Sequence, residues 1–310
     1  MPTDETEGQR VAAVNATKAR AAWASIVSNS VLIAFKLVVG LLSGSIGIIS
    51  EAVHSSSDLI AAVIAFYSVR EAAKPADLKH RYGHEKVENV SGVAEGMLIF
   101  LAAVVIIYEA VQKLMHGLHI DHLWLAIGVM GVSAAANIGV SQFLYPIARK
   151  TESAALEADA AHLRTDVYTS LGVAAGLLLV RLTGKTFFDP ILAIVIALVI
   201  IRTAYKLMSA STRVLLDEAL PDDELAVIRE TVREHKGDLI VGYHQLRTRQ
   251  AGSKRHIDLH ITVDDDLTIG QAHDIAEHII ADIQRRIPNA QVLVHVEPRS
   301  EERDDEFERD

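Results

Sequence analysis

Residues 50–58 read Ser50-Glu-Ala-Val-His54-Ser-Ser-Ser-Asp58 and place ionisable side chains inside an otherwise apolar stretch, Ile46–Val69. A second stretch, Ala155–Leu182, repeats the arrangement as His162-Leu-Arg-Thr-Asp166. In a helix, residues four apart lie on one face, one turn from each other. Ionisable side chains at membrane depth are costly and normally face the interior of a helix bundle. The two His–Asp pairs therefore predict a polar site enclosed by membrane-spanning helices.

Working outward from these pairs, the sequence contains six candidate membrane spans, each with about the 20 mostly apolar residues that cross a bilayer. They are Trp23–Leu42, Ile46–Val69, Val90–Leu114, Leu123–Tyr145, Ala155–Leu182 and Phe187–Leu207. Lys and Arg are concentrated before the first span, in the second and fourth loops and after the sixth span. Because such residues favour the cytoplasmic side, we expect a multi-pass protein of the cell (inner) membrane with both termini in the cytoplasm.

The composition excludes several classes of protein. Half of the 310 residues are hydrophobic, 23% are charged, and the formal net charge is −10. This acidity argues against a nucleic-acid partner, whose phosphates need a basic surface. The chain has no cysteine, so any metal must be held by His, Asp and Glu. The polar N-terminal residues lack the features of a secretory signal peptide.

After the last span, the pattern changes to that of a small water-soluble domain. We expect a helix over 222–236, strands over 239–249 and 254–264, a helix over 269–287 and a strand over 291–297. This αββαβ order predicts a ferredoxin-like α+β fold, with two helices on one side of a three-stranded sheet. The predicted parts are a cytoplasmic N-terminal segment (1–22), a six-span transport domain (23–207), a cytoplasmic metal-binding domain (208–298) and an acidic disordered tail (299–310).

The chemistry of the two polar pairs favours a metal site. Together they offer two imidazoles and two carboxylates, which is the ligand count of four-coordinate zinc. A His–Asp pair could instead form a hydrogen bond that holds a polar helix in place, but the same spacing on two spans favours a shared site. A membrane metalloprotease is the enzyme alternative, and the chain lacks the His-Glu-x-x-His motif of such enzymes. The sequence therefore predicts a metal transporter and not an enzyme.

The same ligands predict coupling to protons. Free imidazole has a pKa near 6.5, so His54 and His162 can exchange protons in the physiological range. Metal binding needs neutral imidazole and ionised carboxylate, so metal and protons compete for one site. A carrier that releases metal outside and binds protons there becomes an antiporter.

Three further motifs accompany the polar pairs: Tyr82-Gly-His84-Glu-Lys86-Val-Glu88, Leu215-Leu-Asp217-Glu-Ala-Leu-Pro221-Asp222 and His244-Gln-Leu-Arg247-Thr-Arg249. With the six spans and the αββαβ domain, they make the chain, from about Ala19 to Pro298, similar to the cation diffusion facilitator family. The resemblance implies a homodimeric metal–proton antiporter whose cytoplasmic domains meet below the membrane.

The resemblance also implies that His54, Asp58, His162 and Asp166 form the transport site. Well-known bacterial zinc and iron exporters of the family carry Asp at the position of His54, and the version with His in both pairs resembles the zinc-selective branch. Imidazole suits zinc, copper and nickel, whereas manganese and magnesium prefer oxygen ligands. Zinc is therefore the expected substrate. Two alternatives remain open: a broader cadmium, cobalt or nickel exporter, and a membrane-anchored metal sensor that does not transport.

Two further features of the second loop follow from the resemblance. Family members hold a metal between the second and third spans with residues that match Asp77, His80 and His84; a solvated pair of loop histidines is the alternative. A charged interlock that helps to hold the family's dimers together maps to Lys86 and Asp217.

A last metal site is expected in the cytoplasmic domain. Strand alternation places His260, His295 and Glu297 on the polar face of the sheet, with His244 and His273 near enough to complete a set. Half-buried surface strands also alternate in this way. The resemblance implies that His244, His260, His273, His295 and Glu297 bind zinc as a regulatory ligand. Because the family often has Asp where Glu297 stands, bridging of two metal ions is less certain.

Overall fold

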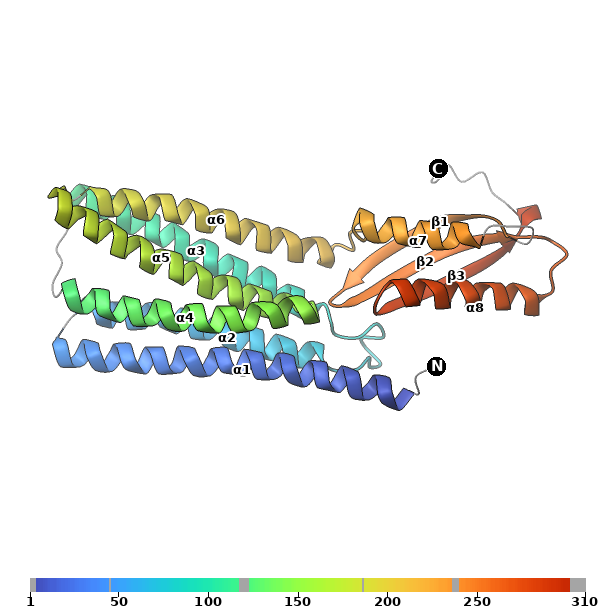
Figure 1. The fold of residues 1–310 in the computed structure, drawn as a ribbon, viewed down its shortest axis with the longest axis horizontal. Helices are drawn as coiled ribbons and strands as arrows, with labels where there is room; N and C mark the ends of the chain where they lie inside the picture. Colours follow the sequence, from blue (N-terminus) through green and yellow to red (C-terminus); the bar gives the residue numbers. More distant parts are fainter. Residues whose placement is uncertain (1–3, 45, 117–122, 186, 236–239, 302–310) are drawn as a thin grey trace. The chain divides into compact units, whose positions relative to one another are not determined.

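The computed structural model describes residues 4–44, 46–116, 123–185, 187–235 and 240–301 (Figure 1). The chain divides into two compact units, Met1–Thr212 and Arg213–Asp310. Each unit is described by itself.

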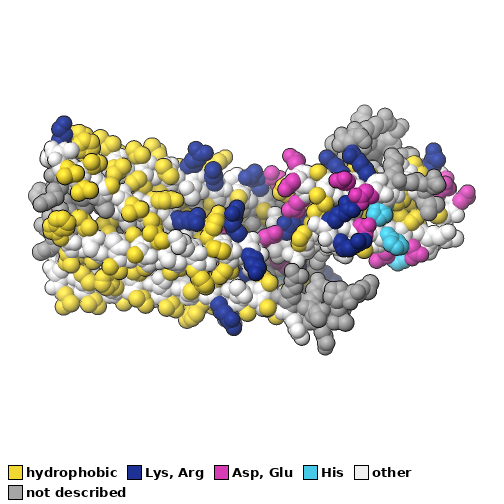
Figure 2. All heavy atoms as spheres, in the orientation of Figure 1, with side chains coloured by type: hydrophobic (Ala, Val, Ile, Leu, Met, Phe, Trp, Pro, Cys, Tyr) yellow, Lys and Arg dark blue, Asp and Glu magenta, His cyan; other side chains and the backbone are white. Residues whose placement is uncertain are grey.

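Six long helices form the first unit (Figure 1). They are α1 (Asp4–Ser43), α2 (Ile46–Ala72), α3 (Val87–His116), α4 (Leu123–Thr151), α5 (Ala154–Thr183) and α6 (Phe188–Leu215). Among the described residues, four segments are long and apolar enough to cross a membrane: Val11–Ser43, Val87–Met115, Ile127–Thr151 and Phe188–Leu215. The helices α2 and α5 are equally long but carry the polar pairs, which lower their hydropathy. Figure 2 shows hydrophobic side chains spread over the surface of this unit.

The first helix begins much earlier than its apolar core. Hydropathy predicts that the first span starts at Trp23, whereas α1 begins at Asp4. Residues 11–22 contain six alanines, the residue with the highest helix propensity. The helix therefore continues through a more polar segment that precedes the expected start of the first span.

Small residues set the spacing of the bundle. Helix α1 packs against α2 and α4, α4 packs against α5, and α5 packs against α2 and α3. One buried cluster lies among α1, α2, α4 and α5 and is rich in alanine: Ala21, Ala22, Ala65, Val69, Leu144, Ala148, Ala155, Leu156, Ala160 and Leu163. Small side chains allow helix backbones to approach closely inside a membrane. At Gly176 of α5, an added Cβ would lie 2.9 Å from the Cα of Asp189 in α6.

The second unit has the predicted αββαβ order. Its elements are α7 (Asp222–Glu234), β1 (Ile240–Ala251), β2 (Lys254–Val263), α8 (Ile269–Arg286), β3 (Ala290–Pro298) and the 3₁₀ turn η1 (Arg299–Glu301). The sheet order is β1-β2-β3, with β1 antiparallel and β3 parallel to β2. Helices α7 and α8 lie over one face of this sheet (Figure 1), and a core of Ile and Val fills the space between. The predicted fold class is confirmed.

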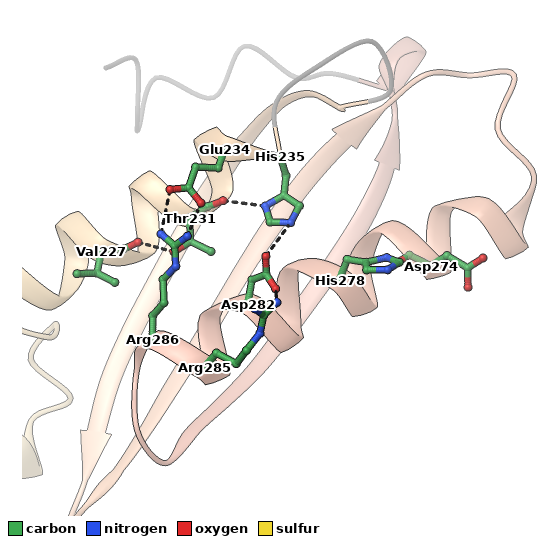
Figure 3. Close-up of polar contacts among 9 residues, drawn as sticks. All are labelled: Val227, Thr231, Glu234, His235, Asp274, His278, Asp282, Arg285 and Arg286. Carbon is green, nitrogen blue, oxygen red and sulfur yellow. Dashed lines mark hydrogen bonds and ion pairs between the residues drawn. The ribbon is translucent and has the colours of Figure 1, made fainter. Parts of the chain in front are cut away.

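Polar contacts also join the two helices (Figure 3). Arg286 near the end of α8 donates a hydrogen bond of 3.1 Å to Glu234 at the end of α7. The Nε2 atom of His235 lies 3.2 Å from Asp282 of α8, and its Nδ1 atom lies 2.8 Å from the carbonyl oxygen of Thr231. These contacts fix the C-terminal ends of α7 and α8 to each other. Of the predicted disordered tail, Arg299–Glu301 forms η1, and residues 302–310 lie outside the described residues.

Candidate metal sites

The buried cluster combines ligands from α2 and α5. One ligand atom each from Asp58, His162 and Asp166 lies within 4.8 Å of the others. The Nε2 atom of His162 is 3.1 Å from Oδ1 of Asp58, although 104 residues separate them in the chain. Asp58 is 7% exposed and His162 is 5% exposed, while Asp166 is half-buried. His54 lies in α2, but its side chain is outside the described part of the chain.

Residues of α1 and α4 support this cluster without being metal ligands. Asn137 of α4 donates a 3.4 Å hydrogen bond to Oδ2 of Asp166. Asn29 of α1 donates a 3.3 Å hydrogen bond to the backbone carbonyl of Asp58. The buried amine of Lys36 in α1 lies 2.6 Å from the hydroxyl of Ser55 and donates to it. None of these three residues was predicted from the sequence. The one feature of the sequence that could have indicated them is a polar side chain within an apolar span.

A second cluster lies in the loop between α2 and α3. The ligand atoms of Asp77, His80 and His84 lie within 4.8 Å of one another. His84 is buried and its Nε2 atom is 3.2 Å from Asp77, while Asp77 and His80 are exposed. Hydrogen bonds from the backbone amides of His80 and Lys79 lower the pKa of the Asp77 carboxyl. This carboxylate therefore stays ionised, as a metal ligand must be. Gly83, with φ at 95°, turns the chain between the two histidines.

A third cluster lies on the sheet of the second unit. The strand register pairs His244 with His260 and His260 with His295, so the three side chains come from neighbouring positions on β1, β2 and β3. Glu297 lies 2.8 Å from His260, 3.2 Å from His244 and 3.5 Å from His295. One ligand atom each of His244, His260 and Glu297 lies within 4.8 Å of the others. The carboxylate of Glu297 is thus surrounded by three imidazoles.

The remaining predicted residues lie apart from these clusters. His273 is exposed on α8 and lines a shallow pocket with Leu267, Val294 and Val296, away from the three-histidine set. Asp217 belongs to the second unit, where Arg249 donates a 3.3 Å hydrogen bond to it, and Lys86 belongs to the first unit. The proposed Lys86–Asp217 interlock stays a prediction.

Comparison with known proteins gives the class. Residues 22–216 match the family model of the cation efflux transmembrane domain, and residues 220–299 match that of the cytoplasmic domain of cation efflux proteins, a dimerisation domain. The chain belongs to the cation efflux (cation diffusion facilitator) family. Members of this family are multi-pass membrane transporters of metal cations and not enzymes.

Individual relatives match over most of their length. An uncharacterized transporter of Synechocystis, sll1263, is 36% identical over 88% of this chain and 89% of its own length. The cation-efflux pump FieF of Salmonella schwarzengrund is 32% identical over 91% of this chain and 93% of its own length. A solved structure of CzrB in its zinc form, described as a candidate zinc transporter, is 30% identical with a TM-score of 0.27. It covers 28% of this chain and 98% of its own.

Proposed function

We propose that the protein exports zinc from the cytoplasm in exchange for protons, as a homodimer in the cell (inner) membrane. The observation that carries this proposal is the buried cluster, in which two separate helices supply Asp58, His162 and Asp166 within 4.8 Å. Ligands of a tetrahedral zinc ion at about 2.1 Å lie roughly 3.4 Å from one another. Since His162 Nε2 and Asp58 Oδ1 are 3.1 Å apart, small side-chain movements are enough for both to bind one ion.

The ligand set accounts for both the metal and the counter-ion. An imidazole with two carboxylates, joined by His54 as a fourth ligand, suits zinc better than manganese or magnesium. The ion neutralises two carboxylates that would otherwise be costly inside a membrane. When zinc leaves, protons can take its place on His162 and the carboxylates. The metal-free carrier then returns to face the cytoplasm without uncompensated charge inside the membrane. The direction of transport then follows the proton gradient.

The arrangement of positive charge supports cytoplasmic termini. Exposed Lys and Arg side chains lie in the first half of α1, at the ends of α2 and α4 and in the second half of α6: Arg20, Arg70, Arg149, Lys150, Arg202 and Lys206. Figure 2 shows most of the Lys and Arg side chains of this unit toward one end of the bundle. By the positive-inside rule, this end faces the cytoplasm.

The other two clusters are proposed to serve regulation. Asp77, His80 and His84 would hold a metal at the cytoplasmic end of α2 and α3. Three imidazoles around Glu297 would bind zinc in the cytoplasmic domain, with His273 reaching such a site only after rearrangement. Metal binding there would offset like-charge repulsion between the two acidic domains of a dimer. The Lys86–Asp217 interlock would then stabilise the dimer.

The test is zinc flux into proteoliposomes under an imposed pH gradient. Asp58→Asn and His162→Gln are expected to abolish gradient-driven flux, because each removes a ligand while conserving size. Glu157→Gln, which neutralises an exposed charge on α5, serves as the matched control and should transport like wild type. Flux that ignores the pH gradient would contradict antiport.

The same assay tests which metal is transported and whether the protein is a transporter or a sensor. A broader exporter would transport cadmium, cobalt or nickel at rates comparable to zinc. Competition among these ions distinguishes it from a zinc-selective exporter. If wild type binds zinc on its cytoplasmic domain but transports no metal, the protein is a membrane-anchored sensor and the proposal is wrong.

A further inference from the structure

An arginine of α5 lies well inside the helical unit and has no carboxylate partner. Arg164 is half-buried and follows the first residue of α5 by ten residues, about 15 Å along the helix axis. Among the described residues, neither Arg164 nor Arg149 of α4 forms an ion pair with a carboxylate. A cation at membrane depth is costly unless an anion compensates it. Arg164 therefore calls for an anionic group from outside the chain.

Two contacts with α4 hold the guanidinium group of Arg164 in place. Its Nε atom donates a 3.2 Å hydrogen bond to the hydroxyl of Ser141, which itself donates a 3.1 Å hydrogen bond to the backbone carbonyl of Ala160. Its central carbon lies 4.2 Å from the centre of the Tyr145 ring. A guanidinium group has five N–H donors, and those on the two terminal nitrogens bond to none of the described residues. The group is thus fixed in position while most of its donors are left for a ligand.

Tyr145 brings a second arginine to the same place. Arg149 lies one turn further along α4 and is exposed, and its central guanidinium carbon lies 5.4 Å from the centre of the same ring. A guanidinium group that packs on an aromatic ring keeps its N–H donors in its own plane, where they can still bind an anion. Lys150, the next residue of α4, is also exposed and adds positive charge. Two guanidinium groups on one ring are suited to a phosphate, which arginine binds through paired N–H···O bonds.

The face of α5 that carries Arg164 is open to the bilayer. Tyr168 and Leu171, four and seven residues further along, lie on the same helical face and are 46% and 56% exposed. Helices α4 and α5 lie side by side (Figure 1). Side chains of a helix are inclined toward its N-terminus, so Arg164 is directed toward the start of α5, the end at which Arg149 lies on α4. A lipid headgroup at this end of the bundle can therefore reach both arginines.

We propose that Arg149 and Arg164, held by Tyr145, bind the phosphate of an anionic phospholipid in the leaflet beside the end of α4 and the start of α5. Basic sites between membrane-spanning helices bind anionic headgroups in this way. Glu157 is exposed on the same face of α5, yet it pairs with neither arginine, so the site keeps its positive charge. A zwitterionic lipid brings a cation as well as a phosphate, so a site with two arginines favours the anionic lipid. The site needs no metal, and the inference is independent of the proposed zinc export.

The test measures binding of phosphatidylglycerol to the full-length protein in detergent by native mass spectrometry. The double variant Arg149→Gln/Arg164→Gln is expected to bind the first lipid roughly 10-fold more weakly than wild type, since each basic residue at a membrane surface contributes on the order of five-fold. Arg202→Gln/Lys206→Gln removes the same charge from exposed positions on α6 and should bind the first lipid like wild type. An equal loss in both double variants would mean that only the overall charge attracts the lipid, and it would overturn the proposal.

A single substitution at an exposed position separates lipid binding from a defect in folding. Arg149→Gln should leave the unfolding temperature of the lipid-free protein unchanged and weaken binding of the first phosphatidylglycerol several-fold. Because the bound lipid contacts both α4 and α5, phosphatidylglycerol should raise the unfolding temperature of wild type more than that of Arg149→Gln. Equal stabilisation of the two proteins by the lipid would contradict the site.

Competition distinguishes a lipid headgroup from free phosphate. Neither phosphatidylcholine nor inorganic phosphate at millimolar concentration should displace phosphatidylglycerol from wild type. If inorganic phosphate displaces the lipid, the arginines bind phosphate alone and the lipid proposal is wrong. All of these measurements use metal-free protein, so their outcome does not depend on whether the protein transports zinc.

Discussion

Asn137 lies where it can affect the affinity of the proposed metal site without binding the metal itself. It lies on α4, which supplies no ligand to the buried cluster, and donates its hydrogen bond to Asp166 of α5. Groups that hydrogen-bond to a ligand fix its orientation and contribute strongly to metal affinity. The amide of Asn137 therefore holds Asp166 toward His162.

Replacement of Asn137 by alanine should weaken zinc binding at the buried cluster by about 10-fold to 100-fold. The expected result is a rise in the zinc concentration at half-maximal flux, with little loss of the maximal rate. Zinc-dependent flux in proteoliposomes measures both quantities.

Asn15→Ala removes the same side chain from a half-exposed position on α1 and serves as the control. Equal zinc dependence in the Asn137 variant and this control would mean that Asp166 needs no such support.

The sequence predicted that Asp58, His162 and Asp166 lie together, but it did not predict the residues around them. Asp58 and His162 were found because a spacing of four recurs on two helices, which is a local pattern. Asn29 and Asn137 have no such pattern, since their partners lie on other helices and the sequence does not specify which helices touch. Glu95 and Asp159 were visible as charges within spans, but their complete burial is a property of the packed bundle.

The contact between α5 and α6 depends on Gly176. A Cβ atom at this position would lie 2.9 Å from the backbone Cα of Asp189, an atom that cannot move without moving α6. Gly176→Ala should therefore separate the two helices and lower stability by about 1–3 kcal/mol, the usual cost of overpacking. Thermal unfolding of the detergent-solubilised protein, followed by size-exclusion chromatography, measures the effect.

Gly139→Ala on α4 is the matched substitution, because a Cβ atom added at this position would have nothing within 4 Å. Alanine is there expected to be neutral or to stabilise, since it has the higher helix propensity. If both variants unfold at the same temperature, the close approach at Gly176 has no energetic importance.

The stability of the contact between the C-terminal ends of α7 and α8 should depend on pH. The hydrogen bonds from Arg286 lower the pKa of the Glu234 carboxyl below its usual value of 4.5. Because this pKa is lower in the folded state, the contribution to stability is fully present above pH 4.5 and is lost as the pH falls through the folded-state value. Acidification below pH 4.5 should therefore loosen the C-terminal turns of both helices.

Hydrogen exchange of the full-length protein, corrected for intrinsic rates, checks this at pH 7 and pH 3.5. Glu234→Gln should remove the part of the pH dependence located at the ends of α7 and α8. Glu277→Gln, exposed elsewhere on α8, should leave it intact. A pH dependence that survives in Glu234→Gln would have to arise from another group.

The elements themselves were largely predictable, and the exceptions have physical causes. The strands β1 and β2 were expected over residues 239–249 and 254–264, because the strand pattern is a local signal. The early start of α1 was missed because hydropathy detects membrane depth, whereas a helix can continue through polar alanine-rich sequence. His273 was grouped with the other predicted ligands because it begins the second helix of the domain and because of the family resemblance, whereas in the structure it lines a pocket with Leu267, Val294 and Val296.

The orientation of the whole molecule can be tested because the chain has no cysteine. Ala76→Cys lies in the exposed loop between α2 and α3, and Lys185→Cys lies in the exposed loop between α5 and α6. With cytoplasmic termini, a membrane-impermeant maleimide added to intact cells should label Lys185→Cys and spare Ala76→Cys.

Permeabilised cells provide the control, since both positions should then react. Labelling of Ala76→Cys in intact cells would contradict the proposed orientation. The loop between α2 and α3 would then lie outside the cell.

The division of the chain into two parts was predictable, because the periodicity of apolar residues changes after the last span. The sequence did not predict which helices of the bundle are neighbours, because several packings satisfy the same pattern of apolar residues. The contacts of α4 with both α1 and α5 arise from complementary small residues, such as Ala22 and Ala148, that only the folded bundle brings together.

The parallel pairing of β3 with β2 has a consequence for biosynthesis. The cytoplasmic cluster needs His244 from β1 and Glu297 from the last strand, so it cannot exist until nearly the whole second unit has left the ribosome. Asp58, His162 and Asp166 are translated long before, and domains generally fold in order from the N-terminus. A nascent chain therefore carries Asp58, His162 and Asp166 for an interval in which the residues of the cytoplasmic cluster are still being synthesised.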